Sequence, residues 1–341
     1  MLGISLSYLY SIIFHQVDID RLHKLVLDYL GVRSVAVVIG GSMGGMAVLE
    51  WPLCTPPGYV RRVIPLATSA RHSAWCISWG EAQRQSIYSD PGYQNGFYTS
   101  QPASGLAAAR MSALLTYRSR DSFENRFGRK PQTSKIQNET LTPPDSPKPS
   151  EADEALAAHN DGLRNARSSS PEGIQSSPLQ KYSIFSAQSY LRYQGDKFIS
   201  RFDANCYIHI TRKLDTHDVA RDRVIDGIDG SSPLALPKVL STLPSRALVI
   251  SIATDGLFTT SEQREIAAHI PQAELVVIPS PDGHDGFLLE FEQINTHILH
   301  YLKREFSEYY DNLEDDEVIE EDFTIKKTSV FGEAEVDIAR W

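Results

Sequence analysis

The chain has 341 residues, of which 41% are hydrophobic, so it can bury the core of one large domain or of two ordinary ones. Its formal net charge of −10 argues against a nucleic acid or an anionic membrane as a partner. Cys54, Cys76 and Cys206 are scattered without a C-x-x-C pair. This spacing predicts free, buried thiols in a reducing compartment and argues against a metal site of the zinc type.

The chain opens with an apolar stretch, Met1–Phe14, which is too short to span a bilayer as a helix. It lacks a basic region and a small-residue cleavage site, so it does not resemble a signal peptide. We interpret residues 1–17 as an atypical N-terminus, with a buried segment as the alternative. Asp18–Leu30 follows with helical apolar spacing, and Gly31 is a typical helix stop.

The next stretch has the order strand, sharp turn, helix. Val35–Ile39 has the apolar, β-branched pattern of a buried parallel strand, and Gly40-Gly41-Ser42-Met43-Gly44 after it matches G-x-S-x-G. In a nucleophile elbow of an α/β-hydrolase, the serine sits on such a strained turn. Ser42 would be the nucleophile, and the N–H of Met43 would face a developing oxyanion. The alternative is a turn that only packs tightly, but the flanking strand and helix favour the nucleophile.

A second strand, Tyr59–Ala67, would complete a parallel, right-handed unit with the first strand and the helix between them. Beyond it the pattern is helical and includes Gly105–Tyr117, which predicts a helical insertion that caps the sheet. Pro131–Pro178 is rich in proline and serine and poor in apolar residues, which is typical of a disordered linker. Helical spacing resumes at Phe185–Phe202.

The sheet resumes after this insertion. The apolar run Ala247–Ala253 predicts a strand that ends just before Asp255, and Glu274–Ile278 predicts a last strand that leads into a loop with His284. Between them, Ser261–His269 has the pattern of a helix capped by its serine. Asp255 and His284 would therefore both lie at the carboxyl edge of the sheet, where ligands bind in open α/β sheets.

Ser42, Asp255 and His284 follow the chain order of a hydrolase triad. His284 would take the proton of Ser42, and Asp255 would hold the imidazole in the right tautomer. Each residue also has an ordinary alternative, since Asp before Gly is common in turns and a loop histidine is commonly solvated. All three in this order, each at a strand end, favour the triad.

Several separate motifs now resemble one family, the homoserine O-acetyltransferases. The motifs are Gly40–Met46, Ala109-Arg110-Met111, Leu115–Arg118, Phe198–Asn205, Lys213–Asp218 and Asp282–Leu288. The linker and the ending Ser329–Glu333 resemble the fungal branch. The resemblance implies an α/β-hydrolase fold, acetyl-CoA as donor substrate, no bound cofactor or metal, and the hydroxyl of L-homoserine as acceptor, in methionine biosynthesis.

The resemblance also implies roles for two further residues. Arg110 would bind the carboxylate of the amino-acid substrate and Asp285 its ammonium group, and the charges suit those roles. The alternatives are that Arg110 pairs with an internal carboxylate and that Asp285 caps the final helix. The resemblance further implies a cytoplasmic homodimer that binds neither nucleic acid nor membrane.

One region departs from the family. Its members have a longer N-terminal region with the first strands of the sheet and a second oxyanion donor, and nothing before Asp18 matches it. We therefore expect an N-terminally incomplete chain. Three functions stay open: homoserine O-acetyltransferase, a related acetyltransferase acting on serine or deacetylcephalosporin C, and an inactive truncated homologue. A plain hydrolase is a weaker fourth.

These observations predict the following organisation. An α/β-hydrolase core comprises residues 18–70 and 240–305, a helical lid insertion comprises 71–239 with a disordered linker at 131–178, and an acidic extension comprises 306–341.

Overall fold

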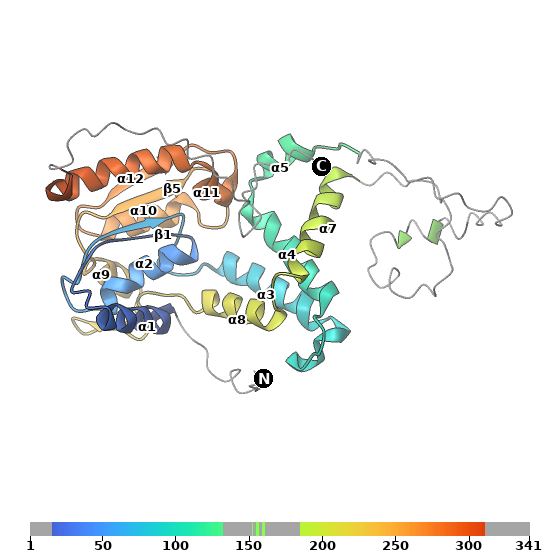
Figure 1. Cartoon of the computed structure of the whole chain (residues 1–341), viewed down its shortest axis with the longest axis horizontal. Helices are drawn as coiled ribbons and strands as arrows, with labels where there is room; N and C mark the ends of the chain where they lie inside the picture. Colours follow the sequence, from blue (N-terminus) through green and yellow to red (C-terminus); the bar gives the residue numbers. More distant parts are fainter. Residues whose placement is uncertain (1–15, 132–151, 153–154, 157–158, 161–184, 311–341) are drawn as a thin grey trace. The chain divides into compact units, whose positions relative to one another are not determined.

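The computed structural model describes residues 16–131 and 185–310, together with 152, 155–156 and 159–160 (Figure 1). These residues form two compact units. The first contains the described residues of 1–82, 115–122 and 205–341, and the second contains those of 83–114 and 123–204. Across the described ranges, no helix has both the length and the apolar character needed to cross a bilayer.

A parallel sheet of four strands forms the centre of the first unit, in the order β1-β2-β5-β6. The strands are β1 (Val35–Gly41), β2 (Val60–Leu66), β5 (Leu248–Ile252) and β6 (Glu274–Ile278). Val35 pairs with Val60, Leu66 with Ile250, and Leu248 with Glu274. Because all neighbouring pairs are parallel, the carboxyl ends of the four strands meet at one edge. The predicted strands and their parallel arrangement are confirmed.

Helices cover both faces of this sheet. They are α2 (Met43–Leu53), α9 (Ala235–Leu240), α10 (Thr260–His269), α11 (Gly286–Leu289) and α12 (Phe291–Glu305), while α1 (Gln16–Tyr29) packs against α2. Val63 and Val249 pack with α2, α9 and α10 on one face, and Ile64 and Ile250 pack with α12 on the other. Figure 1 shows α12 on the opposite side of the sheet from α2. The alternation of side chains along each strand therefore builds two apolar layers on the sheet, while Ile39 of β1 and Val277 of β6, on the two outer strands, stay exposed.

The helix boundaries follow local chemistry. The helix predicted at Asp18–Leu30 is confirmed as α1, and Gly31 after it has φ 76°, a left-handed conformation that suits glycine. The serine cap predicted for the helix at Ser261–His269 is wrong, because α10 begins at Thr260 and its N-cap is Thr259. The Glu262 carboxylate accepts a hydrogen bond from the N–H of Thr259 at 2.6 Å, which is the reciprocal half of a capping box.

The second unit is helical over its described residues. Its elements are the end of α3 (Ala74–Tyr88), the 3₁₀ helix η2 (Pro91–Gly96), most of α4 (Ala103–Tyr117), the end of α5 (Arg120–Phe127), and α7 (Ser186–Ile199). The carboxylate of Asp90 accepts from the N–H of Gly105 at 2.7 Å, and the rings of Phe127 and Tyr190 lie 4.9 Å apart. The helical insertion is thus present, and its role as a lid stays a prediction.

Two details of the structure differ from what the sequence predicts, and some predictions concern residues outside the described ranges. A short antiparallel hairpin, β3 (Val224–Ile225) with β4 (Ile228–Asp229), follows α8 (Ala204–Asp215), and two residues per strand are too few to show a period. Cys206 is exposed, so the expectation of three buried thiols is wrong. The expectations for the apolar start, for nearly all of the 131–178 linker and for most of the acidic extension concern residues outside the described ranges.

Candidate active site

Ser42 occupies the sharp turn between β1 and α2. Its backbone has φ 56° and ψ −124°, a conformation that costs energy for a residue with a Cβ atom. The turn is held from three sides, because the N–H of Ser42 donates to Leu66 O at 3.0 Å and its carbonyl accepts from Gly45 N at 2.9 Å and from Thr68 Oγ1 at 2.7 Å. The hydroxyl group is therefore held at the carboxyl edge of the sheet.

The glycine before this turn allows the tight packing. A Cβ atom on Gly40 would lie 2.6 Å from the carbonyl oxygen of Gly44, which no real contact tolerates. Any larger residue at Gly40 would push the first turn of α2 away from β1. Met43 is the first residue of α2, so its N–H is one of the helix donors that has no partner within the helix.

Ser42, His284 and Asp255 form one hydrogen-bonded chain. The Nε2 atom of His284 lies 2.9 Å from Ser42 Oγ, and its Nδ1 atom lies 2.7 Å from Asp255 Oδ2. With Nδ1–H donating to the carboxylate, Nε2 has its lone pair free to accept the hydroxyl proton. The side chains of His284 and Asp255 are 5% and 0% exposed, so this chain is shielded from water. The three predicted residues are brought together.

The Asp255 carboxylate has two sets of partners. Its Oδ1 atom accepts from the N–H groups of Leu257 at 2.8 Å and Phe258 at 2.9 Å, while Oδ2 faces His284. These two backbone donors fix the direction of the carboxylate. Asp255 therefore does act as a turn residue, as the alternative to the triad supposed. It also makes the contact with the imidazole of His284.

Sheet topology explains why residues so far apart in sequence meet. Ser42 directly follows β1, Asp255 follows β5, and His284 lies in the loop after β6. All of these strands are parallel, so their ends share an edge. The rings of Phe258 and Phe287 lie 5.2 and 5.0 Å from the imidazole and pack against it.

Arg110 and Asp285 belong to different units. Arg110 lies on α4 in the second unit, where it is buried and its guanidinium stands 4.8 Å from the centre of the Phe198 ring. Asp285 follows His284 in the first unit, and its Oδ2 atom lies 2.9 Å from Arg118 Nε. The N-cap of the final long helix, α12, is Glu290, and Asp285 makes no side-chain capping hydrogen bond to the short helix α11 either, so the capping alternative is wrong.

Sequence reasoning missed three residues that contact this site. Thr68, at the end of β2, holds the carbonyl of Ser42. Gln263 is fully buried and donates from Nε2 to the carbonyl oxygens of Thr68 and Phe258, which ties the serine turn to the Asp255 loop. Arg118 forms ion pairs with Asp282 and Asp285, the acidic residues on either side of His284 in the chain. A polar residue one step past a predicted strand is a weak signal for Thr68. Arg118 lies in the family motif Leu115–Arg118, which gave it no role, and Gln263 carries no signal.

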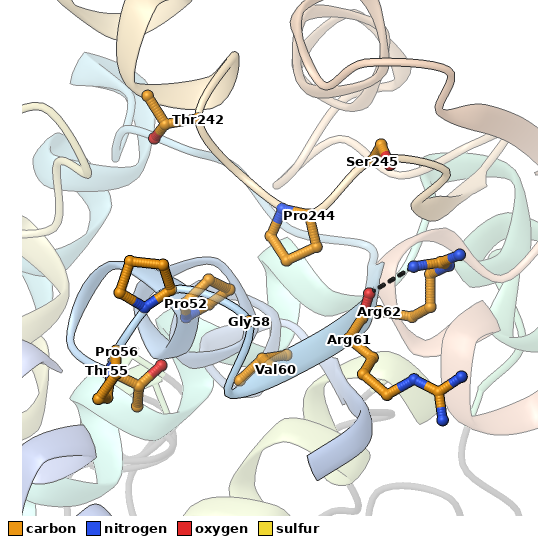
Figure 2. Close-up of a pocket in the computed structure, with 11 residues that line it drawn as sticks. Pro52, Thr55, Pro56, Gly58, Val60, Arg61, Arg62, Thr242, Pro244 and Ser245 are labelled. Atoms are coloured by element: carbon orange, nitrogen blue, oxygen red, sulfur yellow. Dashed lines mark hydrogen bonds between the residues drawn. The ribbon is translucent and has the colours of Figure 1, made fainter. Parts of the chain in front are cut away.

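The described residues contain no cluster of three or more His, Cys, Asp or Glu side chains arranged to hold a metal ion. A cavity of about 380 Å³ lies between the loop before β2 and the loop before β5 and is lined by Pro56, Pro244 and Arg61 among others. Figure 2 shows these side chains. The cavity lies at the amino ends of these strands, at the opposite edge from Ser42. Arg62 donates to Arg61 O at 2.8 Å and pairs with Glu305, so its charge is satisfied internally.

Comparison with known proteins agrees with the fold and the motifs. Residues 6–291 match the family model described as alpha/beta hydrolase fold. A homoserine O-acetyltransferase of Cryptococcus neoformans var. grubii is 53% identical over 95% of this chain and 76% of its own length. One of Saccharomyces cerevisiae is 49% identical over 95% of this chain and 72% of its own length.

A solved structure extends the comparison. The crystal structure of homoserine O-acetyltransferase from Bacillus anthracis has a TM-score of 0.64 to this chain at 19% identity, and it covers 85% of this chain and 66% of its own. At that identity it supports the fold alone. The fold predicted from the sequence is confirmed, and with half of all aligned positions identical to the fungal enzymes, the chain belongs to the homoserine O-acetyltransferase family of the alpha/beta hydrolase fold.

Proposed function

We propose that the protein transfers an acetyl group from acetyl-CoA to the hydroxyl of L-homoserine, through an acetyl group held on Ser42. Membership of the family supports both substrates. The observation that carries the mechanism is the hydrogen-bonded chain from Ser42 Oγ through His284 to Asp255, at 2.9 and 2.7 Å.

In the first half-reaction, Ser42 Oγ attacks the thioester carbonyl while its proton passes to His284 Nε2. The oxyanion forms near the N-terminus of α2, where the N–H of Met43 can donate to it. When the C–S bond breaks, the sulfur of CoA receives the proton from Nε2. Asp255 keeps the imidazole in the required tautomer and stabilises its charged form.

In the second half-reaction, the hydroxyl of the acceptor attacks the acetyl group of Ser42 and gives its proton to the same Nε2 atom. The ester C–O bond to Ser42 breaks, and the serine oxygen takes the proton back. Two residue roles implied by the family remain predictions here: Arg110 for the carboxylate of the acceptor and Asp285 for its ammonium group. A cytoplasmic location and a homodimer are also kept as predictions.

The test is to mix the protein with acetyl-CoA alone and to follow released CoA and the intact mass of the protein. We expect a burst of CoA equal to the enzyme concentration and the added mass of one acetyl group on Ser42. Ser42→Ala should abolish both. Ser78→Ala, which changes an exposed hydroxyl on α3, is the matched control. Turnover without any acetyl-enzyme would contradict the mechanism.

The acceptor is tested separately. Acetyl-enzyme is mixed with L-homoserine, L-serine, deacetylcephalosporin C or buffer, and the decay of the acetyl-protein mass is followed. We expect decay to be fastest with L-homoserine. Fast decay in buffer alone would point to hydrolysis, and faster decay with either of the other acceptors would move the proposal to the related acetyltransferases.

A further inference from the structure

We propose that Arg118 is a positioning residue for the catalytic base: it braces the turn that carries His284 by binding the acidic residues on either side of it. This inference rests on the proposed function, since it gives Arg118 a part in both half-reactions. The residues of this brace, 117–122 and 281–285, all belong to the first unit.

Arg118 forms an ion pair with each of the two acidic residues of this turn. Arg118 Nη1 lies 2.8 Å from Asp282 Oδ1, and its Nε lies 2.9 Å from Asp285 Oδ2. One guanidinium thus spans the turn from two residues before His284 to one residue after it. Its side chain is 13% exposed, so solvent weakens these pairs much less than it weakens pairs on the surface.

The backbone of the His284 turn also packs against the backbone next to Arg118. Gly283 has φ 68°, and a Cβ atom there would lie 2.5 Å from Ser119 N and 2.7 Å from the carbonyl carbon of Arg118. The turn therefore lies directly on the backbone of the bracing segment. Two serine side chains add hydrogen bonds, from Ser119 Oγ to Pro281 O and from Ser122 Oγ to Asp282 Oδ1 at 2.6 Å.

Charge explains why a guanidinium is needed. Asp282 and Asp285 place two carboxylates on one short turn, and without a cation they would repel each other. A guanidinium can donate to both at once because its N–H groups point in fixed, divergent directions. An ammonium group can satisfy one carboxylate well, but it cannot hold the same two directions.

The consequence concerns rates more than binding. His284 Nε2 must meet Ser42 Oγ in both half-reactions, and a displacement of about 1 Å in such a contact can cost about 100-fold in rate. We therefore expect Arg118→Ala to slow acylation of Ser42 by up to about 100-fold, and to slow acetyl transfer to the acceptor by a similar factor. The KM for acetyl-CoA should change little.

The experiment compares the CoA burst rates of Arg118→Ala and Arg118→Lys with wild type, and repeats them with millimolar guanidinium chloride. We expect the lysine variant to be intermediate and added guanidinium to restore part of the rate of the alanine variant. Two controls are matched. Arg120→Ala removes an exposed arginine two residues on, and Arg71→Ala breaks the ion pair with Asp218 elsewhere in the unit. Both should stay within about twofold of wild type.

A second readout does not depend on activity. Amide hydrogen exchange, followed by mass spectrometry, should become faster across residues 280–286 in Arg118→Ala and stay unchanged there in Arg71→Ala. If Arg118→Ala acylates Ser42 at the wild-type rate with a normal burst, the proposed brace is wrong. Unchanged amide hydrogen exchange across residues 280–286 would overturn it as well. Absence of a burst in wild type would instead contradict the proposed function, with the exchange result still deciding on the brace. If Arg118→Ala does not fold, Arg118→Lys, which keeps the charge and loses the two donor directions, is read by the same two measurements.

Discussion

Thr68 Oγ1 donates a hydrogen bond of 2.7 Å to the carbonyl oxygen of Ser42. The contact joins the end of β2 to the strained turn after β1. It thus restrains the residue whose backbone has the unfavourable φ of 56°. Strained conformations persist only when their surroundings hold them, and this hydroxyl is one of the groups that does so.

We predict that Thr68→Val, which keeps the shape and removes the donor, slows acylation of Ser42 by about fivefold. The basis is the net value of a hydrogen bond, about 1 kcal/mol, where a factor of ten corresponds to about 1.4 kcal/mol. The measurement is the CoA burst rate. Thr55→Val removes a similar threonine hydrogen bond, to Trp51 O, at the far edge of the sheet and is the matched control. An unchanged burst rate in Thr68→Val would mean that the turn at Ser42 keeps its conformation without the Thr68 hydrogen bond.

The sequence predicted the hydrogen-bonded chain of Ser42, His284 and Asp255 because its signals are local. A β-branched run, a glycine-flanked serine and two polar residues just past other apolar runs are all visible without a structure. Parallel strands then put their ends at one edge, which brings Ser42 to His284. This inference needs only the direction of each strand and not its exact position.

The sequence could not reveal the contacts that hold these three residues in place. Gln263 lies in a predicted helix, and only the packing of that helix brings its amide to Thr68 O. Arg118 follows a helical motif, and nothing in its neighbours indicates that its partners lie more than 160 residues further on. Such hydrogen bonds depend on side-chain directions between elements, which the periodicity of a single segment does not contain.

The Asp255 carboxylate allows a sharp test of the tautomer role. We predict that Asp255→Asn lowers kcat by about 10⁴-fold, because an amide would favour the wrong tautomer of His284. Asn can still accept from the N–H groups of Leu257 and Phe258, so the loop should keep its shape. Asp222→Asn, at a side chain that is 88% exposed, should leave kcat unchanged. A loss below tenfold would show that Asp255 only shapes its loop.

Arg110 is tested by separating the half-reactions. If it binds the carboxylate of the acceptor, Arg110→Ala should leave the CoA burst intact and slow the decay of acetyl-enzyme with L-homoserine by about 100-fold, the value of about 3 kcal/mol for a charge-assisted pair. Arg201→Ala, an exposed arginine of the same unit, is the control. Equal losses in both half-reactions would indicate instead that Arg110 stabilises its unit by packing on Phe198.

Glu50 of α2, the helix that follows Ser42, forms an ion pair with Arg223. Glu50 lies on α2 with its side chain 4% exposed, and its Oε2 atom is 2.6 Å from Arg223 Nη2. Burial raises the pKa of the Glu50 carboxyl above its ordinary value of 4.5, and the attraction of Arg223 offsets only part of that rise. Removing one partner of a buried pair leaves the other charge without compensation.

The sign of the pH dependence follows from the raised pKa. Between pH 4.5 and the folded pKa, the folded protein keeps a proton that the unfolded chain has already released. Glu50 therefore contributes most to stability below pH 4.5, and this contribution falls as the pH rises through the folded pKa. Arg223→Ala raises the cost of charging Glu50, so it should destabilise the protein by about 3–5 kcal/mol at neutral pH and by clearly less in acid. Denaturant midpoints of wild type, Arg223→Ala and Glu50→Gln across this pH range provide the measurement, with Glu292→Gln on exposed α12 surface as control. An equal loss at all pH values in Arg223→Ala would show that Arg223 acts by packing and not by compensating the charge of Glu50.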